Sequence, residues 1–328
     1  MKLSRRQFGQ GVAGAAALGA FGGLATPALA ARTLIYGNSG NAQSSSNMFA
    51  AQWLAEVEKR TNGELKFDIK AGTIGGEKDI LDGASLGTVH IYNGAYTGLR
   101  EFDVFYTPYF ARDSDHAQKI VYDLLWDQLS AAMGGRYNVH FMSVGRAGPW
   151  KLFLKEPIET FADLQGMKIR APQIEGVVAG LEQVGAKPTV IPFNEVYSAL
   201  QQGVVDGMAT LGNLGISQKF YEVAKYVVTN DWGVGLDKQA MNLPTWNGLP
   251  QEQKDVLIGS FKEMEPTEFY GKTMEREAED FKKWEEFNGP GTVLTLDATA
   301  AQKLLEPAVA KLTDDIFGAG TYDKIQAL

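Results

Sequence analysis

The chain has 328 residues, and its 39 acidic residues outnumber its 31 basic ones, which gives a formal net charge of −8 at pH 7. It contains no cysteine, which excludes disulfides, a cysteine nucleophile and thiolate metal ligands. The acidic balance argues against nucleic acid as a partner, but it does not exclude a small anionic ligand, because a local basic site decides that.

The first 30 residues have the pattern of an export signal. A twin-arginine motif at residues 4–8 precedes a weakly apolar, glycine-rich run at residues 9–24 and an A-x-A site at residues 28–30. An uncleaved membrane anchor is the alternative, but a spanning helix needs about 20 mostly apolar residues. We predict a twin-arginine signal peptide at residues 1–30, cleaved near Ala30, and a periplasmic protein.

The next part of the chain alternates expected strands and helices. Strands are expected at residues 33–37, 65–69, 89–92 and 139–144, and helices at residues 47–60, 77–86 and 114–133. In the first of these helices Phe49, Trp53 and Val57 recur every four residues and therefore share one face. Such alternation predicts βαβ units with parallel strands.

The second half repeats the scheme. Strands are expected at residues 167–170, 188–191 and 207–209, and helices at residues 174–184 and 194–202. In both halves a helix that ends at a glycine, Gly87 or Gly203, leads into a strand, which supports two equivalent lobes. A charged helix is expected at residues 251–287, with a kink or break at Pro266, and a helix of this length can brace both lobes.

Motifs typical of enzymes fail on their context. Residues 83–87 match the G-x-S-x-G pattern around Ser85, but a nucleophile elbow needs a strand before the serine, and here a helix precedes it. The near match to a P-loop at residues 180–187 begins inside a helix. The histidines lack the spacing of metal ligands. We predict no cofactor, no metal and no catalysis, with a periplasmic serine hydrolase using Ser85 as a remote alternative.

Two arginines are candidates for binding an anion. Arg170 closes the expected strand at residues 167–170, and ligands of open α/β sheets bind beyond the carboxyl ends of the strands. Arg146 follows the strand ending at Val144 and has small neighbours that would let a ligand approach. For each of them, a surface or ion-paired arginine is the alternative.

Four motifs in this half carry a family resemblance. They are K-I-R-A-P at residues 168–172, G-A-K-P-T at 185–189, P-F-N-E-V-Y-S-A-L-Q-Q-G-V-V-D-G at 192–207 and Q-K-F-Y-E-V at 218–223. This pattern resembles the signature of DctP-type solute-binding proteins of tripartite ATP-independent periplasmic (TRAP) transporters. The resemblance covers essentially the whole chain after the export signal.

The resemblance implies an α/β, two-lobe periplasmic binding protein fold, with mixed sheets, hinge strands and a long helix spanning both lobes. We expect lobe I at residues 31–143 plus about 236–275, and lobe II at residues 144–235 plus about 276–328. It also implies a monomer that captures a carboxylate-bearing organic acid by lobe closure and delivers it to the small and large membrane subunits. An ABC-type or receptor-linked binding protein shares this architecture and is the alternative.

The resemblance further implies roles for single residues. Arg170 corresponds to the arginine that pairs with the ligand carboxylate, Arg146 to a second, more variable arginine, and Phe193 to a ring that packs on the ligand. Thr210 stands where many members have an asparagine that contacts the ligand, so the polar pattern of the ligand should differ here.

Three further residues are weaker candidates for the cleft. Asn93 and either Asn38 or Asn41 fall at strand ends that face the cleft in the family, although ordinary turn chemistry explains them equally well. Trp150 is a candidate for an aromatic wall, with a buried core tryptophan as the alternative.

Overall fold

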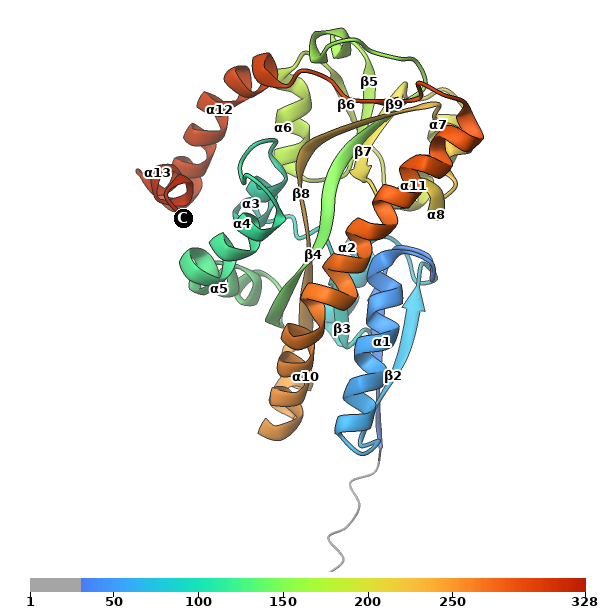
Figure 1. Cartoon of the computed structure of the whole chain (residues 1–328). Coiled ribbons are helices and arrows are strands. Elements are labelled where there is room, and N and C mark those ends of the chain that lie inside the picture. The colour runs from blue at the N-terminus through green and yellow to red at the C-terminus, as the bar shows by residue number, and fades with distance from the viewer. Residues whose placement is uncertain (1–30) are drawn as a thin grey trace, which may run out of the picture. The chain divides into compact units, whose positions relative to one another are not determined.

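A single mixed β-sheet organises the protein in the computed structural model, which describes residues 31–328. The strand order is β2-β1-β3-β8-β4-β7-β5-β6, with β9 paired to β8 (Figure 1). The strands are β1 (Arg32–Asn38), β2 (Leu65–Ala71), β3 (Ile91–Gly94), β4 (Val139–Leu154), β5 (Lys168–Ala171), β6 (Lys187–Val190), β7 (Gly207–Leu211), β8 (Tyr226–Asn242) and β9 (Val293–Leu294). The expected signal peptide and its cleavage site lie outside the described residues.

Two groups of parallel strands form the two lobes. In the first lobe β1 pairs in parallel with β2 and β3, and in the second lobe β5 pairs in parallel with β6 and β7. The predicted βαβ units are therefore confirmed in both halves. The antiparallel pairs all involve β4 or β8, which lie between the two groups and make the sheet mixed.

The strands β4 and β8 connect the lobes. The end of β8 pairs with β3 in the first lobe, and the end of β4 pairs with β7 in the second. Between these ends β4 and β8 pair with each other along most of their length, with register shifts near Ser143, Gly148 and Leu152. The expected strand at residues 139–144 is only the first part of β4, and β8 is longer still and was not predicted from the sequence.

Helices cover the sheet. The α-helices are α1 (Ser45–Arg60), α2 (Glu77–Leu86), α3 (Arg100–Asp103), α4 (Ser114–Lys119), α5 (Trp126–Arg136), α6 (Glu175–Gln183), α7 (Val196–Gln201), α8 (Leu214–Ser217), α9 (Leu243–Asn247), α10 (Gln251–Met264), α11 (Lys272–Asn288), α12 (Thr299–Phe317) and α13 (Thr321–Gln326). Single-turn 3₁₀ segments lie at Val104–Tyr106, Phe161–Leu164, Phe193–Glu195 and Phe220–Glu222. Two π-helical segments, Ile120–Leu125 and Glu265–Gly271, interrupt longer helices. None of the helices described is both long and apolar enough to cross a membrane.

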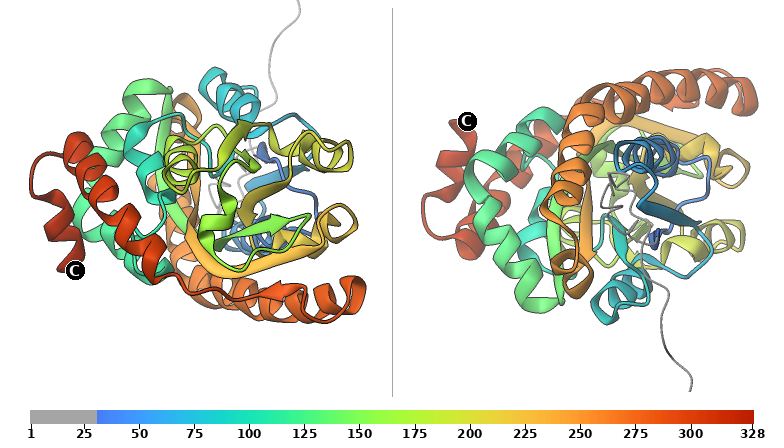
Figure 2. Two further views of the ribbon diagram at one scale, coloured as in Figure 1. Left: turned by 90° about the horizontal axis from the view of Figure 1, so that it is seen from above. Right: turned by 90° about the horizontal axis from the view of Figure 1, so that it is seen from below.

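The long helix predicted near the C-terminus braces both lobes, as Figure 1 and Figure 2 show in orange. Its first part, α10, contacts α1 of the first lobe, where the Trp53 indole nitrogen donates to the Ser260 hydroxyl at 3.1 Å. In its last part, α11, Trp284 packs on Phe153 of β4, with ring centroids 5.1 Å apart. The expected break at Pro266 is the π-helical segment between α10 and α11, where proline removes a backbone donor.

Candidate functional site

Arg170 carries a buried positive charge without an acidic partner. Strand alternation directs Ile169 into the core, and Arg170 is itself only 2% exposed. Its Nε donates to the Ile191 carbonyl oxygen at 2.9 Å and one Nη to the Ala209 carbonyl oxygen at 3.3 Å. Burial lowers the pKa of this guanidinium to about 10, and Glu77 is the acidic group whose charge acts against that shift. A buried charge without a partner is unfavourable, so this geometry is suited to receiving an anion.

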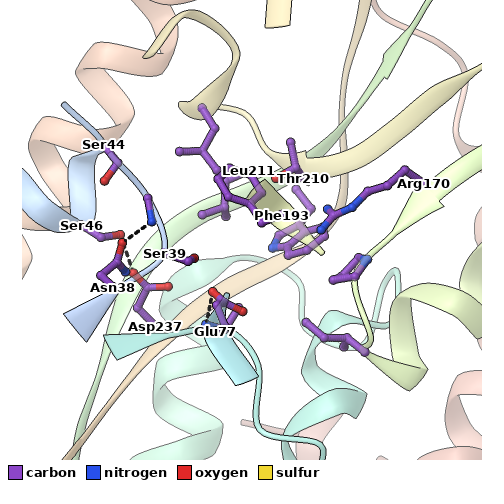
Figure 3. A pocket seen from close by; sticks show the side chains of 16 residues that line it. Asn38, Ser39, Ser44, Ser46, Glu77, Arg170, Phe193, Thr210, Leu211 and Asp237 are labelled. Carbon is purple, nitrogen blue, oxygen red and sulfur yellow. Dashed lines mark hydrogen bonds between the residues drawn. The ribbon is translucent and has the colours of Figure 1, made fainter. Parts of the chain in front are cut away.

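Arg170 lines a cavity between the two lobes, drawn in Figure 3. The second lobe and the end of β4 contribute mainly Trp150, Arg170, Phe193, Thr210 and Leu211. The first lobe and β8 contribute mainly Asn38, Ser39, Ser44, Ser46, Glu77 and Asp237. One wall is therefore cationic and apolar, and the facing wall is made of hydroxyls, an amide and carboxylates.

Five of the residues singled out from the sequence come together in this cavity, namely Asn38, Trp150, Arg170, Phe193 and Thr210. Thr210 reaches it because β7 lies beside β5, so the carboxyl ends of both parallel strands meet at one edge. The Phe193 ring centroid lies 5.9 Å from the Arg170 guanidinium carbon, and Trp150 packs edge-on against Tyr106 with centroids 5.5 Å apart. Their contact with a ligand stays a prediction.

Asn93 and Asn41, which were predicted to face the cleft, do not line the cavity. Asn93 is fully buried behind the cavity wall, where its Oδ1 accepts from the Nδ2 of Asn38 at 2.5 Å, and Asn38 is the one that lines the cavity. Asn41 stands outside the cavity lining, and its Nδ2 donates to the Ser217 carbonyl oxygen at 2.9 Å. This bond links the loop after β1 in the first lobe to α8 in the second.

Arg146 does not line the cavity, contrary to the role expected for it. Its Nε and Nη2 donate to both carboxylate oxygens of Glu265, at 3.0 and 2.7 Å, and its Nη1 binds Asp115. The Tyr270 ring centroid lies 4.3 Å from its guanidinium carbon. The physical reason is that β4 continues past Val144, so Arg146 lies inside a strand and not in a loop beyond its end. Its side chain faces the π-helical segment between α10 and α11, which contains Glu265.

Sequence reasoning missed two acidic residues of the cavity. Glu77, the first residue of α2, accepts from the backbone nitrogens of Ala95 at 3.1 Å and Tyr96 at 2.9 Å. Asp237 is 4% exposed on β8 and accepts from the Ser46 hydroxyl at 2.5 Å. Burial, together with the charge of Glu77, raises the pKa of Asp237 to about 6. The signal in the sequence was an acidic residue within the otherwise mostly uncharged run at residues 232–242.

A second cavity adjoins the first. Glu77, Arg170, Pro172 and Phe193 line both, and Tyr96 lines only the second. The Arg170 side chain therefore lies where the two spaces meet.

Ser85 lies inside α2, and Gly87 ends that helix in the left-handed conformation with φ of 84°, as predicted. The strand that a nucleophile elbow needs before its serine is therefore replaced by a helix. In residues 31–328 no group of three or more histidine, aspartate or glutamate side chains is placed to hold a metal ion.

The comparison with known proteins agrees with this geometry. Residues 36–316 match the model of the DctP family, described as bacterial extracellular solute-binding protein, family 7. The chain belongs to this family. The family is one of transport proteins that bind solutes outside the cytoplasm, and its members include the solute-binding proteins of TRAP transporters.

Two curated relatives illustrate the family. The 2,3-diketo-L-gulonate-binding periplasmic protein YiaO of Escherichia coli is 27% identical over 270 residues, which are 80% of each chain. The C4-dicarboxylate-binding periplasmic protein DctP of Rhodobacter capsulatus is 27% identical over 289 residues, which are 85% of each chain.

Solved structures share the fold. A TRAP periplasmic solute-binding protein of Roseobacter denitrificans with bound L-galactonate has a TM-score of 0.81 and 24% identity, covering 90% of this chain and 98% of its own. One from Sulfurospirillum deleyianum with bound succinate has a TM-score of 0.80 and 25% identity, covering 91% and 99%. The two-lobe fold expected from the sequence is thereby confirmed.

Proposed function

We propose that this protein captures a carboxylate-bearing organic acid between its lobes, with Arg170 as the residue that pairs with the carboxylate. The observation that carries the proposal is a buried guanidinium that only backbone carbonyls hold and that lines an interlobe cavity. An arginine has five N–H donors, so this side chain keeps donors free for a ligand. A planar guanidinium binds a carboxylate in two parallel hydrogen bonds, which fixes its orientation as well as its charge.

The rest of the cavity complements that role. The Phe193 ring and Trp150 offer apolar surface beside Arg170, and Thr210 offers a hydroxyl where many family members have an amide. We place the first lobe at residues 31–143 plus about 236–275 and the second at residues 144–235 plus about 276–328, moving about β4 and β8. The bond from Asn41 to the Ser217 carbonyl would form as the lobes close.

The relatives support an organic acid as the ligand. The names of the two curated relatives specify 2,3-diketo-L-gulonate and C4-dicarboxylates, and the two solved structures contain L-galactonate and succinate. Each of these compounds carries at least one carboxylate. A single arginine recognises that shared group, while the remaining wall distinguishes the acids.

We infer the biological setting from the N-terminal sequence and the family together, and the family supports a periplasmic location. The protein is exported by its twin-arginine signal, cleaved near Ala30, and works in the periplasm as a monomer. It delivers the acid to the small and large membrane subunits of a TRAP transporter, catalyses no reaction and binds no nucleic acid.

Calorimetry on Arg170→Ala tests the proposal. A thermal-shift screen of organic acids first identifies a ligand, because a compound that binds only the folded protein raises its melting temperature. The variant should lose about 100-fold or more in affinity for it, since the ligand carboxylate would be buried without a partner. Arg136→Ala, which removes an exposed arginine, is the matched control and should bind normally. A change of less than about threefold at position 170 would contradict the assignment.

A further inference from the structure

The cavity has opposite charges at its two ends. Arg170 on β5 supplies the positive end, and Figure 3 shows Asp237 and Ser46 on the other side of the space, with Glu77 between the walls. Asp237 lies on β8 and Glu77 at the start of α2, so the acidic groups belong to the lobe opposite Arg170. Two carboxylates therefore face one guanidinium across the space for a ligand.

The acidic end has unused capacity to accept hydrogen bonds. Asp237 accepts from Ser46 and also from Asn93, and a carboxylate offers about four acceptor positions in all. The two oxygens of Glu77 each accept from one backbone nitrogen, which leaves a lone pair on each. Ser39 and Ser44 add hydroxyls to the same wall.

The nearest cation to that end, Lys238, does not line the cavity, although its charge acts on both Asp237 and Glu77. Lys238 follows Asp237 on β8, and strand alternation directs it to the opposite face. Its Nζ is held there by the Ala95 carbonyl oxygen at 2.6 Å and the Tyr106 hydroxyl at 2.5 Å. Among the described residues that line the cavity, Arg170 is the one with a positive charge.

This arrangement constrains both ends of the ligand. A carboxylate that binds Arg170 leaves the rest of the molecule against Asp237 and Glu77. A second carboxylate there would face two like charges in a buried space, where charge repulsion is screened far less than in water. A hydroxyl group would instead donate to these oxygens.

Resting on the proposed function, we propose that the ligand is a polyhydroxy monocarboxylate, a sugar acid with one carboxylate, and that Asp237 and Glu77 select against dicarboxylates. The carboxylate binds Arg170, and hydroxyls further along the chain donate to the acidic pair.

Matched ligands separate this inference from the proposed function. Sorbitol, gluconate and glucarate share one six-carbon hydroxylated chain but carry zero, one and two carboxylates, and galactitol, galactonate and galactarate form a second such series. Calorimetry with these compounds and with succinate should give the tightest binding to a monocarboxylate, by about tenfold or more over its own diacid and polyol.

The Asp237→Asn variant tests whether Asp237 selects against dicarboxylates. It keeps the size of the side chain and removes one negative charge, so the ratio of monocarboxylate to dicarboxylate affinity should fall by about tenfold. Asp127→Asn makes the same change at an exposed position and should leave the ratio unaltered. The wild-type series does not depend on the folding of either variant.

The outcomes are distinct. If a dicarboxylate or succinate binds the wild type most tightly while Arg170→Ala abolishes that binding, the inference is overturned and the proposed function stands. If the polyols bind as tightly as the acids, the proposed function fails and the inference fails with it. If none of these acids binds, but the wider screen finds another carboxylate that needs Arg170, the inference is overturned and the proposed function stands. An unchanged affinity ratio in a folded Asp237→Asn variant overturns the role of Asp237.

Discussion

Arg146 and Arg170 are both almost completely buried arginines on strands of the same sheet, but their surroundings differ. Arg146 lies in the middle of β4 and is neutralised by both oxygens of Glu265 and by Asp115. Arg170 lies at the end of β5 and is held by carbonyl oxygens alone. Burial therefore does not distinguish the two arginines, and it is the lack of an acidic partner at a cavity wall that supports Arg170 as the proposed ligand contact.

Arg170→Met tests the unpaired side of this comparison and should have the largest effect. Loss of the partner for a ligand carboxylate should weaken binding by about 3–5 kcal/mol. The melting temperature of the ligand-free protein should stay level or rise, because the variant removes a charge that burial disfavours. Calorimetry and thermal denaturation measure the two effects. A fall in melting temperature with intact binding would mean that Arg170 is a structural residue like Arg146.

Arg146→Met tests the paired side. It leaves Glu265 buried without its cation, so the free energy of unfolding should fall by about 3 kcal/mol in denaturant titrations. Binding by the folded fraction should change by less than about threefold. The double variant Arg146→Met with Glu265→Leu should recover much of the stability, because it removes both charges. Loss of ligand affinity without loss of stability would restore Arg146 as a ligand contact.

The ion pair between Lys151 of β4 and Glu277 of α11 is a weaker counterpart of the Arg146 pair, with a distance of 3.7 Å between Nζ and Oε1. Burial raises the pKa of Glu277 to about 7, with Asp231 and Asp280 adding to that shift and Lys151 opposing it. A carboxyl with a raised folded pKa stabilises the fold below its unfolded pKa and loses that contribution as pH rises through the folded value.

In thermal denaturation of the ligand-free protein, Glu277 should therefore contribute a fall in stability between pH 5 and pH 7, by up to about 1.4 kcal/mol per pH unit. Burial lowers the pKa of three histidines, namely His90, His116 and His140. Their contributions have the opposite sign, so the test compares variants rather than the sign of the whole profile. Relative to the wild type, Glu277→Gln should remove the Glu277 contribution from the profile, while the exposed Glu279→Gln should leave it in place. Asp237, whose pKa burial raises to about 6, leaves a residual slope of the same sign. The same slope in the wild type and in Glu277→Gln would contradict the assignment.

Phe193→Leu should have the smallest effect. The Phe193 centroid is 5.9 Å from Arg170, against 4.3 Å between Tyr270 and Arg146, so the aromatic ring at the cavity is the looser of the two. Its loss should weaken ligand binding by about 1 kcal/mol with little change in stability. Tyr270→Leu should do the reverse, lowering stability and sparing affinity. Calorimetry on both variants checks the pair.

The sequence predicted the part of the cavity that local patterns encode. Arg170, Phe193 and Thr210 stand at the ends of short strands or just after them, where alternation of helix and strand marks the edge of a sheet. The two lobes followed from the same alternation and from the family motifs.

The rest depended on long-range packing. The strand β4 runs on through Gly145, Arg146, Gly148 and Pro149, residues that locally favour a loop, because β8 pairs with it on one side. Asp237 lies in β8 next to Lys238, and these two charged residues interrupt the apolar run that is typical of a buried strand. Their burial depends on Ser46 and Tyr106, which lie far away in the sequence. The hydrophobic periodicity within one segment does not reveal partners that are so distant in the sequence.

The pairing of β4 with β8 also governs how the protein folds. The strand β8 is the antiparallel partner of β3 and the longest partner of β4, and it is complete only when the chain has been synthesised as far as Asn242. Neither lobe is a continuous stretch of sequence that completes its own sheet, so the nascent protein has to close large loops before its centre forms. High contact order of this kind slows folding, and partly made chains expose unpaired strand edges. Chains truncated before β8 should therefore aggregate rather than yield an isolated lobe.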